Sequence, residues 1–317
     1  MLDTAIDLYS GFGGAYEAAK AAGLKVVHSA NHAPIAVKAL RANTTPDHTV
    51  ECQDLHLADF TKWRDHTVGL AGPSCKGFTR ARGKDKPHHD HLRASMWNVV
   101  TCAEIWREKV WVVENVPEVM NWVLWPAWVA AMKALGYSLS FETLDAADFG
   151  VPQHRVRVFI VATQTKNPVS LDLNPWKTDP VGVRSFIDWD YKRWSPVHKP
   201  GRSEKVLNQI AQGRADLKTD RFLIPYYGSG SGLTGRSLDR PCGTIVSQDV
   251  WAIVDGDRMR MMQPHEAQLI MGFRADYKRV GTRREQMRGF GNAWCPPVAT
   301  AIIEAVAQQT GLISLAA

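Results

Sequence analysis

The sequence predicts an α/β fold with a doubly wound, mostly parallel sheet and a second, smaller domain. Two observations lead to this prediction. Short apolar runs alternate with amphipathic helical stretches in the first half of the chain, and this alternation stops after Thr163. Alternating strands and helices favour parallel strands with both faces of the sheet covered. We therefore expect a large sheet domain over 1–164 and 261–317 and a small domain over 165–260.

The expected strands are short apolar runs, several of them rich in valine, at 5–9, 25–29, 68–71, 110–114, 138–144 and 156–163. Between them, apolar residues recur with helical spacing at 15–22, 33–42, 92–107 and 126–135. The region 165–260 is instead rich in proline, tryptophan and charge, with a glycine-rich stretch at 228–232. A final helix is expected at 296–309, where two prolines suit the first turn, and it returns to the first domain.

The composition indicates a soluble globular protein. The 317 residues are 45% hydrophobic and 22% charged, and the best candidate for a membrane helix, 119–135, is interrupted by Asn121, Pro126 and Lys133. The first residues lack the pattern of an export signal, so we expect a cytoplasmic protein without a membrane segment. The five cysteines include no CxxC pair, which argues against a disulfide framework and against a zinc site.

Basic residues outnumber acidic ones, and they are clustered along the chain. The formal net charge is +6, which suits a polyanionic partner. One basic cluster lies within 76–93 and another within 274–288. Two solvated faces explain this distribution equally well, so charge alone leaves both interpretations open.

A glycine-rich turn follows the first expected strand. It runs from Asp7 to Gly14 and includes Tyr9, Ser10, Gly11 and Gly13. Such a turn lets a ligand approach the backbone closely, although a purely structural turn is the alternative. Asn31 and Asp54 are placed at the ends of the next strands, where their side chains suit hydrogen bonds to a ribose and an adenine edge. Either side chain is equally explained as a helix cap.

Two further motifs place reactive groups at strand ends. Cys75 lies in a Gly-Pro-Ser loop beside Lys76, where a nearby positive charge favours the thiolate needed for nucleophilic catalysis. Glu114 ends an apolar strand, and limited contact with water there raises the proton affinity of a carboxyl group. An inert core cysteine and a capping carboxylate are the alternatives.

A third motif, Gln153-His154-Arg155-Val156-Arg157, leads into an apolar strand. Strand periodicity predicts that Gln153, Arg155 and Arg157 share one face, so that two guanidinium groups address a common anionic or carbonyl-bearing substrate. Taken singly, each arginine is also explained as a solvated charge at the edge of the sheet.

Together and in this order, the motifs resemble the DNA cytosine-5 methyltransferase family, closest in look to its phage or prophage branch. The resemblance rests on the segments 7–14, 73–79, 114–116, 153–157, 240–244 and 291–297. A stretch at 261–273 is also similar to the family. The resemblance spans nearly the whole chain except about 165–235. It implies a Rossmann-like catalytic domain that binds S-adenosylmethionine and a small target-recognition domain.

The resemblance implies a role for each motif. Cys75 adds to C6 of a flipped-out cytosine in double-stranded DNA, Glu114 holds and protonates N3, Arg157 binds the exocyclic oxygen and Arg155 supports the loop. The cofactor lies along the turn and along Asn31, Asp54 and Asn292. The resemblance also implies DNA contacts by a basic set made up of Lys76, Arg80, Arg82, Lys84 and Arg240. It further implies a monomer in a prokaryotic or phage-infected cell, with a partner endonuclease not visible in the sequence.

Three positions depart from the family pattern. Ser74 replaces the usual proline before the cysteine, Lys76 replaces the usual glutamine after it, and Asn31 stands where an acidic ribose ligand is usual. Lys76 suits a lowered thiol pKa, a phosphate contact or a donor with an extra carboxylate. An RNA cytosine methyltransferase and a relative that binds cofactor or DNA without turnover are the alternative functions.

Overall fold

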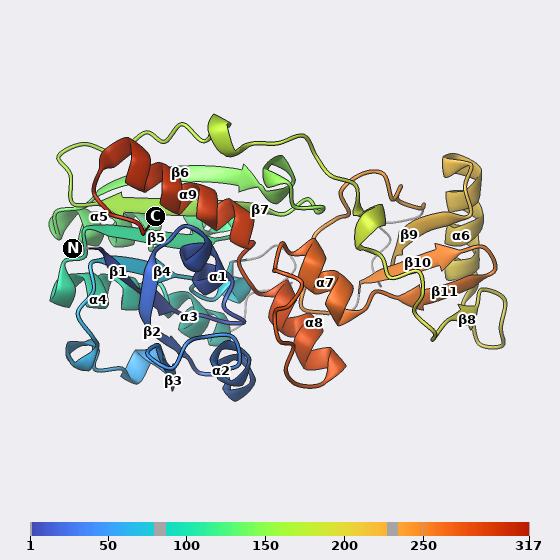
Figure 1. The fold of residues 1–317 in the computed structure, drawn as a ribbon, viewed down its shortest axis with the longest axis horizontal. Coiled ribbons are helices and arrows are strands. Elements are labelled where there is room, and N and C mark those ends of the chain that lie inside the picture. Colours follow the sequence, from blue (N-terminus) through green and yellow to red (C-terminus); the bar gives the residue numbers. More distant parts are fainter. Residues whose placement is uncertain (1, 79–86, 227–233, 249, 317) are drawn as a thin grey trace. The chain divides into compact units, whose positions relative to one another are not determined.

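The computed structural model describes residues 2–78, 87–226, 234–248 and 250–316 (Figure 1). By contacts the chain forms two compact units. The first unit comprises 1–146, 156–177 and 293–317, and the second comprises 147–155 and 178–292. This division differs from the predicted boundaries because 147–155 and 261–292 belong to the second unit and 165–177 belongs to the first.

The first unit is built on a seven-stranded sheet in the order β3-β2-β1-β4-β5-β7-β6. The strands are β1 Thr4–Leu8, β2 Lys25–Asn31, β3 Thr49–Cys52, β4 Val68–Ala71, β5 Val110–Asn115, β6 Ser138–Asp145 and β7 Val156–Thr163. Neighbours from β3 to β5 pair in parallel, and β7 runs antiparallel to both β5 and β6. The predicted doubly wound, mostly parallel fold is confirmed.

This topology gathers several strand ends at one edge of the sheet, which we call the carboxyl edge. The five parallel strands β1 to β5 end there. Because β7 is reversed, its first residues also lie there, and Val158 pairs with Asn115 at the end of β5. Any site built from these ends therefore draws on segments that are distant in the sequence.

The helices of the first unit are α1 Gly14–Ala21, α2 Pro34–Arg41, α3 Pro87–Ala94, α4 Trp97–Trp106, α5 Trp125–Ala134 and α9 Pro296–Thr310. The single helix expected over 92–107 is divided into α3 and α4. At the break, Ser95 Oγ donates to the Leu92 carbonyl at 2.6 Å, a local bond that competes with the helical ladder. Strand β3, which is short and half polar, was not predicted. Within the described ranges no helix has the length and apolar character of a membrane span.

Short 3₁₀ turns connect many of these elements. They are η1 Leu55–Leu57, η2 Phe60–Lys62, η3 Cys75–Gly77, η5 Pro117–Asn121, η6 Ala146–Phe149, η7 Asn174–Trp176 and η8 Val183–Phe186. Asp54 and Asp59 cap η1 and η2 by accepting backbone N–H bonds.

The main core fills the space between the sheet and the helices α4 and α5. Ile6, Trp111 and Ile160 come from the sheet, and Val99 and Trp128 come from the two helices. Trp128 also donates from Nε1 to the Met96 carbonyl at 2.9 Å, so this large ring is buried with its polar atom paired. Elsewhere in the unit, α9 packs against α1, and Figure 1 shows both helices lying over the sheet.

The close packing of α1 depends on Gly14. A Cβ atom at Gly14 would lie 2.4 Å from the carbonyl oxygen of Trp294, just before α9. We expect Gly14→Ala to lower the free energy of unfolding of the first unit by about 2 kcal/mol, because backbone must shift to admit the methyl group. Urea unfolding measures this loss. A loss no larger than that of Gly311→Ala, where only a positive φ opposes the new methyl group, would contradict the packing role.

Two buried histidines lie where β2 pairs with β3. His48 stacks on Tyr16 with ring centroids 5.0 Å apart, and its Nε2 lies 2.9 Å from Ser29 Oγ. Burial lowers the pKa of His48 to about 4, and the nearby His28 contributes to the decrease. The neutral ring is therefore the form that the folded state favours.

This depressed pKa predicts acid sensitivity. An unfolded histidine takes up a proton near pH 6.5, whereas folded His48 does so only near pH 4. The stabilisation is therefore complete above pH 6.5 and is lost as the pH falls to about 4. We expect His48→Gln to remove about 2 kcal/mol of this pH dependence, as measured by urea unfolding at several pH values. His32→Gln is the control, because His32 is exposed, and an equal effect of both variants would contradict the assignment.

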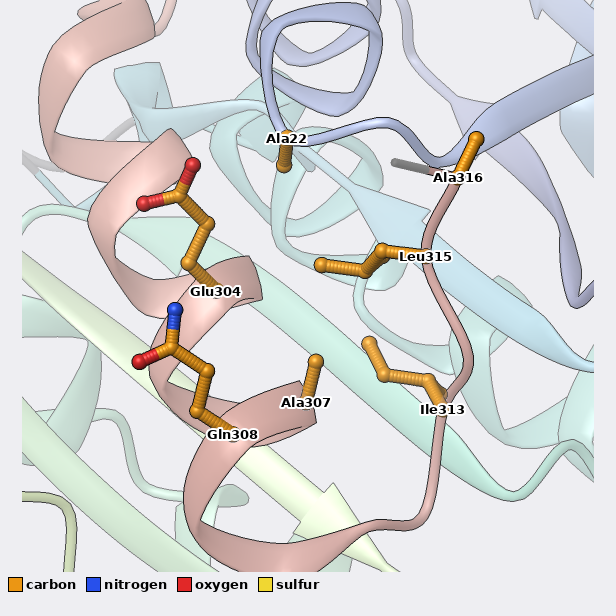
Figure 2. Close-up of a pocket in the computed structure, with 7 residues that line it drawn as sticks. All are labelled: Ala22, Glu304, Ala307, Gln308, Ile313, Leu315 and Ala316. Atoms are coloured by element: carbon orange, nitrogen blue, oxygen red, sulfur yellow. The ribbon is translucent and has the colours of Figure 1, made fainter.

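The C-terminal segment folds back over the opposite edge of the first unit. Ala316 N donates to the Gly23 carbonyl at 2.9 Å, and Ser314 N donates to Asp3 Oδ2 at 2.7 Å. Between this segment and α9 lies an open hollow of about 410 Å³, shown in Figure 2 and lined by Ala22, Glu304, Ala307, Gln308, Ile313, Leu315 and Ala316. Gly23 precedes β2 and Asp3 precedes β1, so the hollow lies away from the carboxyl edge.

The second unit contains a four-stranded antiparallel sheet in the order β8-β11-β10-β9. Its strands are β8 Ser195–Pro196, β9 Arg221–Pro225, β10 Trp251–Asp255 and β11 Arg258–Met261, and its helices are α6 Glu204–Leu217, α7 Pro264–Ile270 and α8 Arg283–Gly291. A small core joins α6 to the sheet through Val206, Ile210, Phe222 and Val254. Arg260 and Glu266 form a buried ion pair at 2.6 Å, which ties α7 to β11.

Candidate active site

The glycine-rich turn leaves the end of β1 in a strained conformation. Tyr9 has a φ of 61°, and Gly11 and Gly13 have φ values of 53° and 78°. A left-handed conformation suits glycine but is costly for tyrosine, so the turn stores strain at the carboxyl edge. Among the described residues other than its chain neighbours, a Cβ at Gly11 would approach nothing closer than the Tyr9 carbonyl oxygen at 3.8 Å. The space beside Gly11 is therefore open to a ligand.

Asp7 lies on β1 just before this turn and is almost fully buried. Within the described part of the chain, its Oδ2 atom has no hydrogen-bond partner. Burial raises the pKa of the Asp7 carboxyl well above its usual range. A buried acceptor without a partner is uncommon in proteins, and it is the kind of group that a bound ligand satisfies.

Asp54 acts as a cap, which was one of the two alternatives from the sequence, whereas Asn31 makes a local turn bond and Ala33 is the N-cap of α2. Asn31 Oδ1 accepts from Ala33 N at 2.9 Å before α2, and Asp54 Oδ1 accepts from His56 N at 3.0 Å before η1. Asp54 is exposed and lies close enough to the Tyr9 hydroxyl to add to the rise that burial causes in the Tyr9 pKa. These bonds hold both side chains at the carboxyl edge, where other lone pairs remain for a ligand.

The Cys75 loop follows β4 and is fastened at several backbone atoms. Cys75 is half-buried and begins η3. Asn115 Nδ2 donates to the Pro73 carbonyl at 3.3 Å, and Arg93 Nε donates to the Gly77 carbonyl at 3.0 Å. The thiol is thus presented from a loop that is held by the end of β5 on one side and by α3 on the other.

Glu114 and Arg157 form an ion pair at the same edge. Arg157 Nε lies 3.0 Å from Glu114 Oε1, and the two side chains are 16% and 11% exposed. Antiparallel pairing of β5 with β7 brings these residues together, since Glu114 lies opposite Phe159. Asn115, which follows Glu114 on β5, holds the Cys75 loop. A carboxyl group, a guanidinium group and a thiol are therefore carried by directly connected segments.

Arg155 corrects one prediction from the sequence. Strand β7 begins at Val156, so Gln153 and Arg155 precede it and do not share a strand face with Arg157. Arg155 is buried, and its Nη1 donates to the carbonyls of Ile245 and Gly291 at 3.1 and 3.2 Å. These bonds lie within the second unit, where Arg155 braces the backbone.

Known proteins resemble the chain over almost its whole length. The model of the C-5 cytosine-specific DNA methylase family matches residues 4–221 and 208–308. The chain belongs to this family. Its function as a DNA cytosine-5 methyltransferase, predicted from the ordered motifs, is thereby supported at the level of the family.

Individual relatives agree with this assignment. The type II methyltransferase M1.HphI of Haemophilus parahaemolyticus is 26% identical, with 96% of this chain and 86% of the relative covered. M.NlaX of Neisseria lactamica is 24% identical, with 98% and 97% covered. Among solved structures, the Dnmt2 methyltransferase of S. pombe aligns with a TM-score of 0.69 at 16% identity, covering 97% of this chain and 98% of that one. A protein assigned as a prophage DNA modification methyltransferase of E. coli has a TM-score of 0.68 at 19% identity, covering 96% and 98%. The two structures show the shared methyltransferase fold.

The other predicted site residues of the methyltransferase are placed as follows. Lys76 is exposed beside Cys75, and Arg240 and Asn292 are exposed in the second unit. Asn292 ends α8, and its backbone N–H donates to the Arg288 carbonyl at 3.2 Å. The predicted DNA contacts Arg80, Arg82 and Lys84 lie outside the described residues.

The sequence did not single out a buried polar group at the other edge of the methyltransferase sheet. Glu108 accepts from His66 Nε2 at 3.0 Å, from Trp111 Nε1 at 2.9 Å and from Cys102 Sγ at 3.4 Å. His66, Cys102 and Glu108 bring potential metal-ligand atoms within 4.8 Å of one another. Cysteine spacing does not reveal this set because its members are distant in the sequence. Protein donors satisfy the carboxylate, so the group is explained as a structural network.

Proposed function

We propose that this methyltransferase transfers a methyl group from S-adenosylmethionine to C5 of a cytosine in double-stranded DNA, through a covalent bond between Cys75 and C6. The observation that supports this most is the connection of three segments at the carboxyl edge. The Cys75 loop is held by Asn115, and the adjacent Glu114 is paired with Arg157. This set supplies a nucleophile, a proton donor and a cation for one aromatic ring.

The residues have distinct roles in the proposed reaction. Cys75 Sγ attacks C6 and forms a carbon–sulfur bond, and the electron pair of the C5–C6 double bond makes C5 nucleophilic. Glu114 donates a proton to N3 and so offsets the negative charge that develops on the ring. Arg157 donates to the exocyclic oxygen. After methyl transfer, C5 loses its proton to a base and Cys75 leaves as the double bond re-forms.

The glycine-rich turn and the strand ends next to it fit the methyl donor. The cofactor, when bound, supplies an electrophilic methyl group. We assign its binding to Asp7, Tyr9, Ser10, Gly11, Gly13, Asn31, Asp54 and Asn292, with Gly14 acting through packing. Two observations support the fit. The space beside Gly11 is open, and Asp7 Oδ2 is a buried acceptor that lacks a partner within the described residues.

DNA is the proposed substrate, because the net charge of +6 suits a polyanion and the target atom lies inside a stacked duplex. The cytosine must therefore leave the stack to reach Cys75. Exposed Lys76 and Arg240, with Arg80, Arg82 and Lys84, are assigned to phosphate contacts. We assign target recognition to the second unit. The names of the curated relatives as type II methyltransferases favour a role in restriction and modification.

Labelled methyl transfer tests the substrate class. We expect label from S-adenosylmethionine to enter double-stranded DNA, and unlabelled RNA of the same sequence to compete poorly. DNA without cytosine is the matched control, and it should remain unlabelled. Preferred labelling of RNA, or label in the DNA without cytosine, would overturn the proposed substrate.

A further inference from the structure

The corner between α3 and α4 contacts both the Cys75 loop and the glycine-rich turn that follows β1. Ser95 lies at this corner and is buried. Its Oγ accepts from the backbone N–H of Ser74, the residue before the nucleophile, at 3.1 Å. The same Oγ donates to the Leu92 carbonyl at 2.6 Å, which fixes its orientation. One hydroxyl therefore joins the Cys75 loop to the end of α3.

The backbone of the same corner also holds the glycine-rich turn after β1, which we call the cofactor turn. Tyr9 Oη donates to the Ser95 carbonyl at 3.2 Å and accepts from Asn98 Nδ2 at 2.5 Å. Tyr9 belongs to the strained turn, and partial burial of its side chain raises the pKa of its hydroxyl. A desolvated hydroxyl does not readily exchange its protein partners for water. The position of the Tyr9 ring is therefore linked to the position of Ser95.

We propose that Ser95 is a positioning residue that couples the cofactor turn to the Cys75 loop through the path Tyr9 to Ser95 to Ser74. The inference rests on the proposed function, because it assigns the turn to S-adenosylmethionine. A ligand that contacts the Tyr9 ring shifts the Ser95 carbonyl through the hydrogen bond from Tyr9 Oη. The hydrogen bond between the Ser95 hydroxyl and the backbone N–H of Ser74 then transmits this shift to the residue before Cys75. Cofactor binding thereby adjusts the nucleophile before DNA arrives.

The coupling has a definite thermodynamic form. If cofactor binding alters the loop equilibrium, then the state of the loop alters cofactor affinity by the same factor. Bonds from Asn115 and Arg93 also hold the loop, but they begin at β5 and α3 rather than at the turn. Removing the Ser95 hydroxyl should therefore uncouple the two parts without releasing the loop completely.

The test measures how fast iodoacetamide alkylates Cys75, by peptide mass spectrometry, with and without S-adenosylhomocysteine. In the wild type we expect S-adenosylhomocysteine to change the alkylation rate by about 5-fold, which corresponds to the free energy of one hydrogen bond. In Ser95→Ala the ratio should fall to nearly one, while the dissociation constant for S-adenosylhomocysteine, measured by calorimetry, stays within about 3-fold of the wild-type value. Tyr9→Phe keeps the ring but loses the hydroxyl, and it should also bring the ratio to nearly one when S-adenosylhomocysteine is saturating.

Two further variants separate positioning from a general structural role. Ser95→Thr keeps the hydroxyl and should restore the wild-type ratio. Thr101→Ala removes a hydroxyl from α4 that bonds to the Trp97 carbonyl within its own helix, and it should leave the ratio unchanged. A wild-type ratio that persists in Ser95→Ala overturns the coupling but leaves the proposed function standing. Failure of the wild type to bind S-adenosylhomocysteine overturns both.

Discussion

Cys75→Ser is expected to form no covalent complex with duplex DNA that contains 5-fluorocytosine. The fluorine cannot leave as a proton does, so by the proposed reaction the wild-type enzyme should remain attached to the base after methyl transfer. A serine hydroxyl is a much weaker nucleophile than a thiolate, and we expect the methylation rate to fall by about 10⁴-fold or more. Denaturing gel electrophoresis detects the complex, and labelled methyl transfer measures the rate.

Cys52→Ser is the matched control for this experiment. Cys52 is an exposed free cysteine in the same unit, and no role in the reaction is assigned to it. The control should form the complex at the wild-type rate. A complex that persists in Cys75→Ser would show that Cys75 is not the nucleophile. Loss of the complex in Cys52→Ser would indicate that Cys52 is the nucleophile instead.

Glu114→Gln is expected to lower kcat by about 10³-fold while the affinity for DNA changes little. An amide keeps the size of the carboxyl group but cannot deliver a proton to N3. It also removes the negative partner of Arg157, which lies 3.0 Å away. Single-turnover methylation and a DNA-binding titration separate the two effects.

Glu142→Gln provides the control for Glu114. Both glutamates lie opposite Phe159, Glu114 on β5 and Glu142 on β6. The substitution on β6 should leave kcat unchanged, because none of the residues assigned to the reaction lies on this strand. Equal loss in both variants would indicate a general effect of charge on the sheet, and full activity of Glu114→Gln would contradict the proton-donor role.

Much of the fold followed from local patterns. Local patterns marked six of the seven strands of the first unit: a central strand such as β5 is buried and apolar along its length, and the edge strand β6 alternates apolar with polar residues. Strand β3 was not predicted, because Thr49 and Glu51 are polar and the strand pairs with β2 alone at the edge of the sheet. The break between α3 and α4 was also not predicted, because it depends on a bond of the Ser95 side chain rather than on apolar spacing.

The candidate site was predictable to the extent that its residues lie in ordered motifs. Glu114 and Arg157 were both singled out from their motifs, but their ion pair was not predicted, because it depends on the antiparallel pairing of β7 with β5. Arg155 could not be placed from periodicity, because strand β7 starts one residue later. Ser95 and Asn98 gave only a faint signal, that of polar residues inside an apolar helical pattern.

The most direct test of the account is nucleoside mass spectrometry on DNA from cells that express the wild-type protein or the Cys75→Ser variant. It reports the polymer, the modified base and the transferred group in one measurement. The proposed reaction predicts 5-methyldeoxycytidine with the wild type and none above background with the variant. Unmodified DNA in both samples, a mass gain other than one methyl group, or equal methylation by the variant would contradict it.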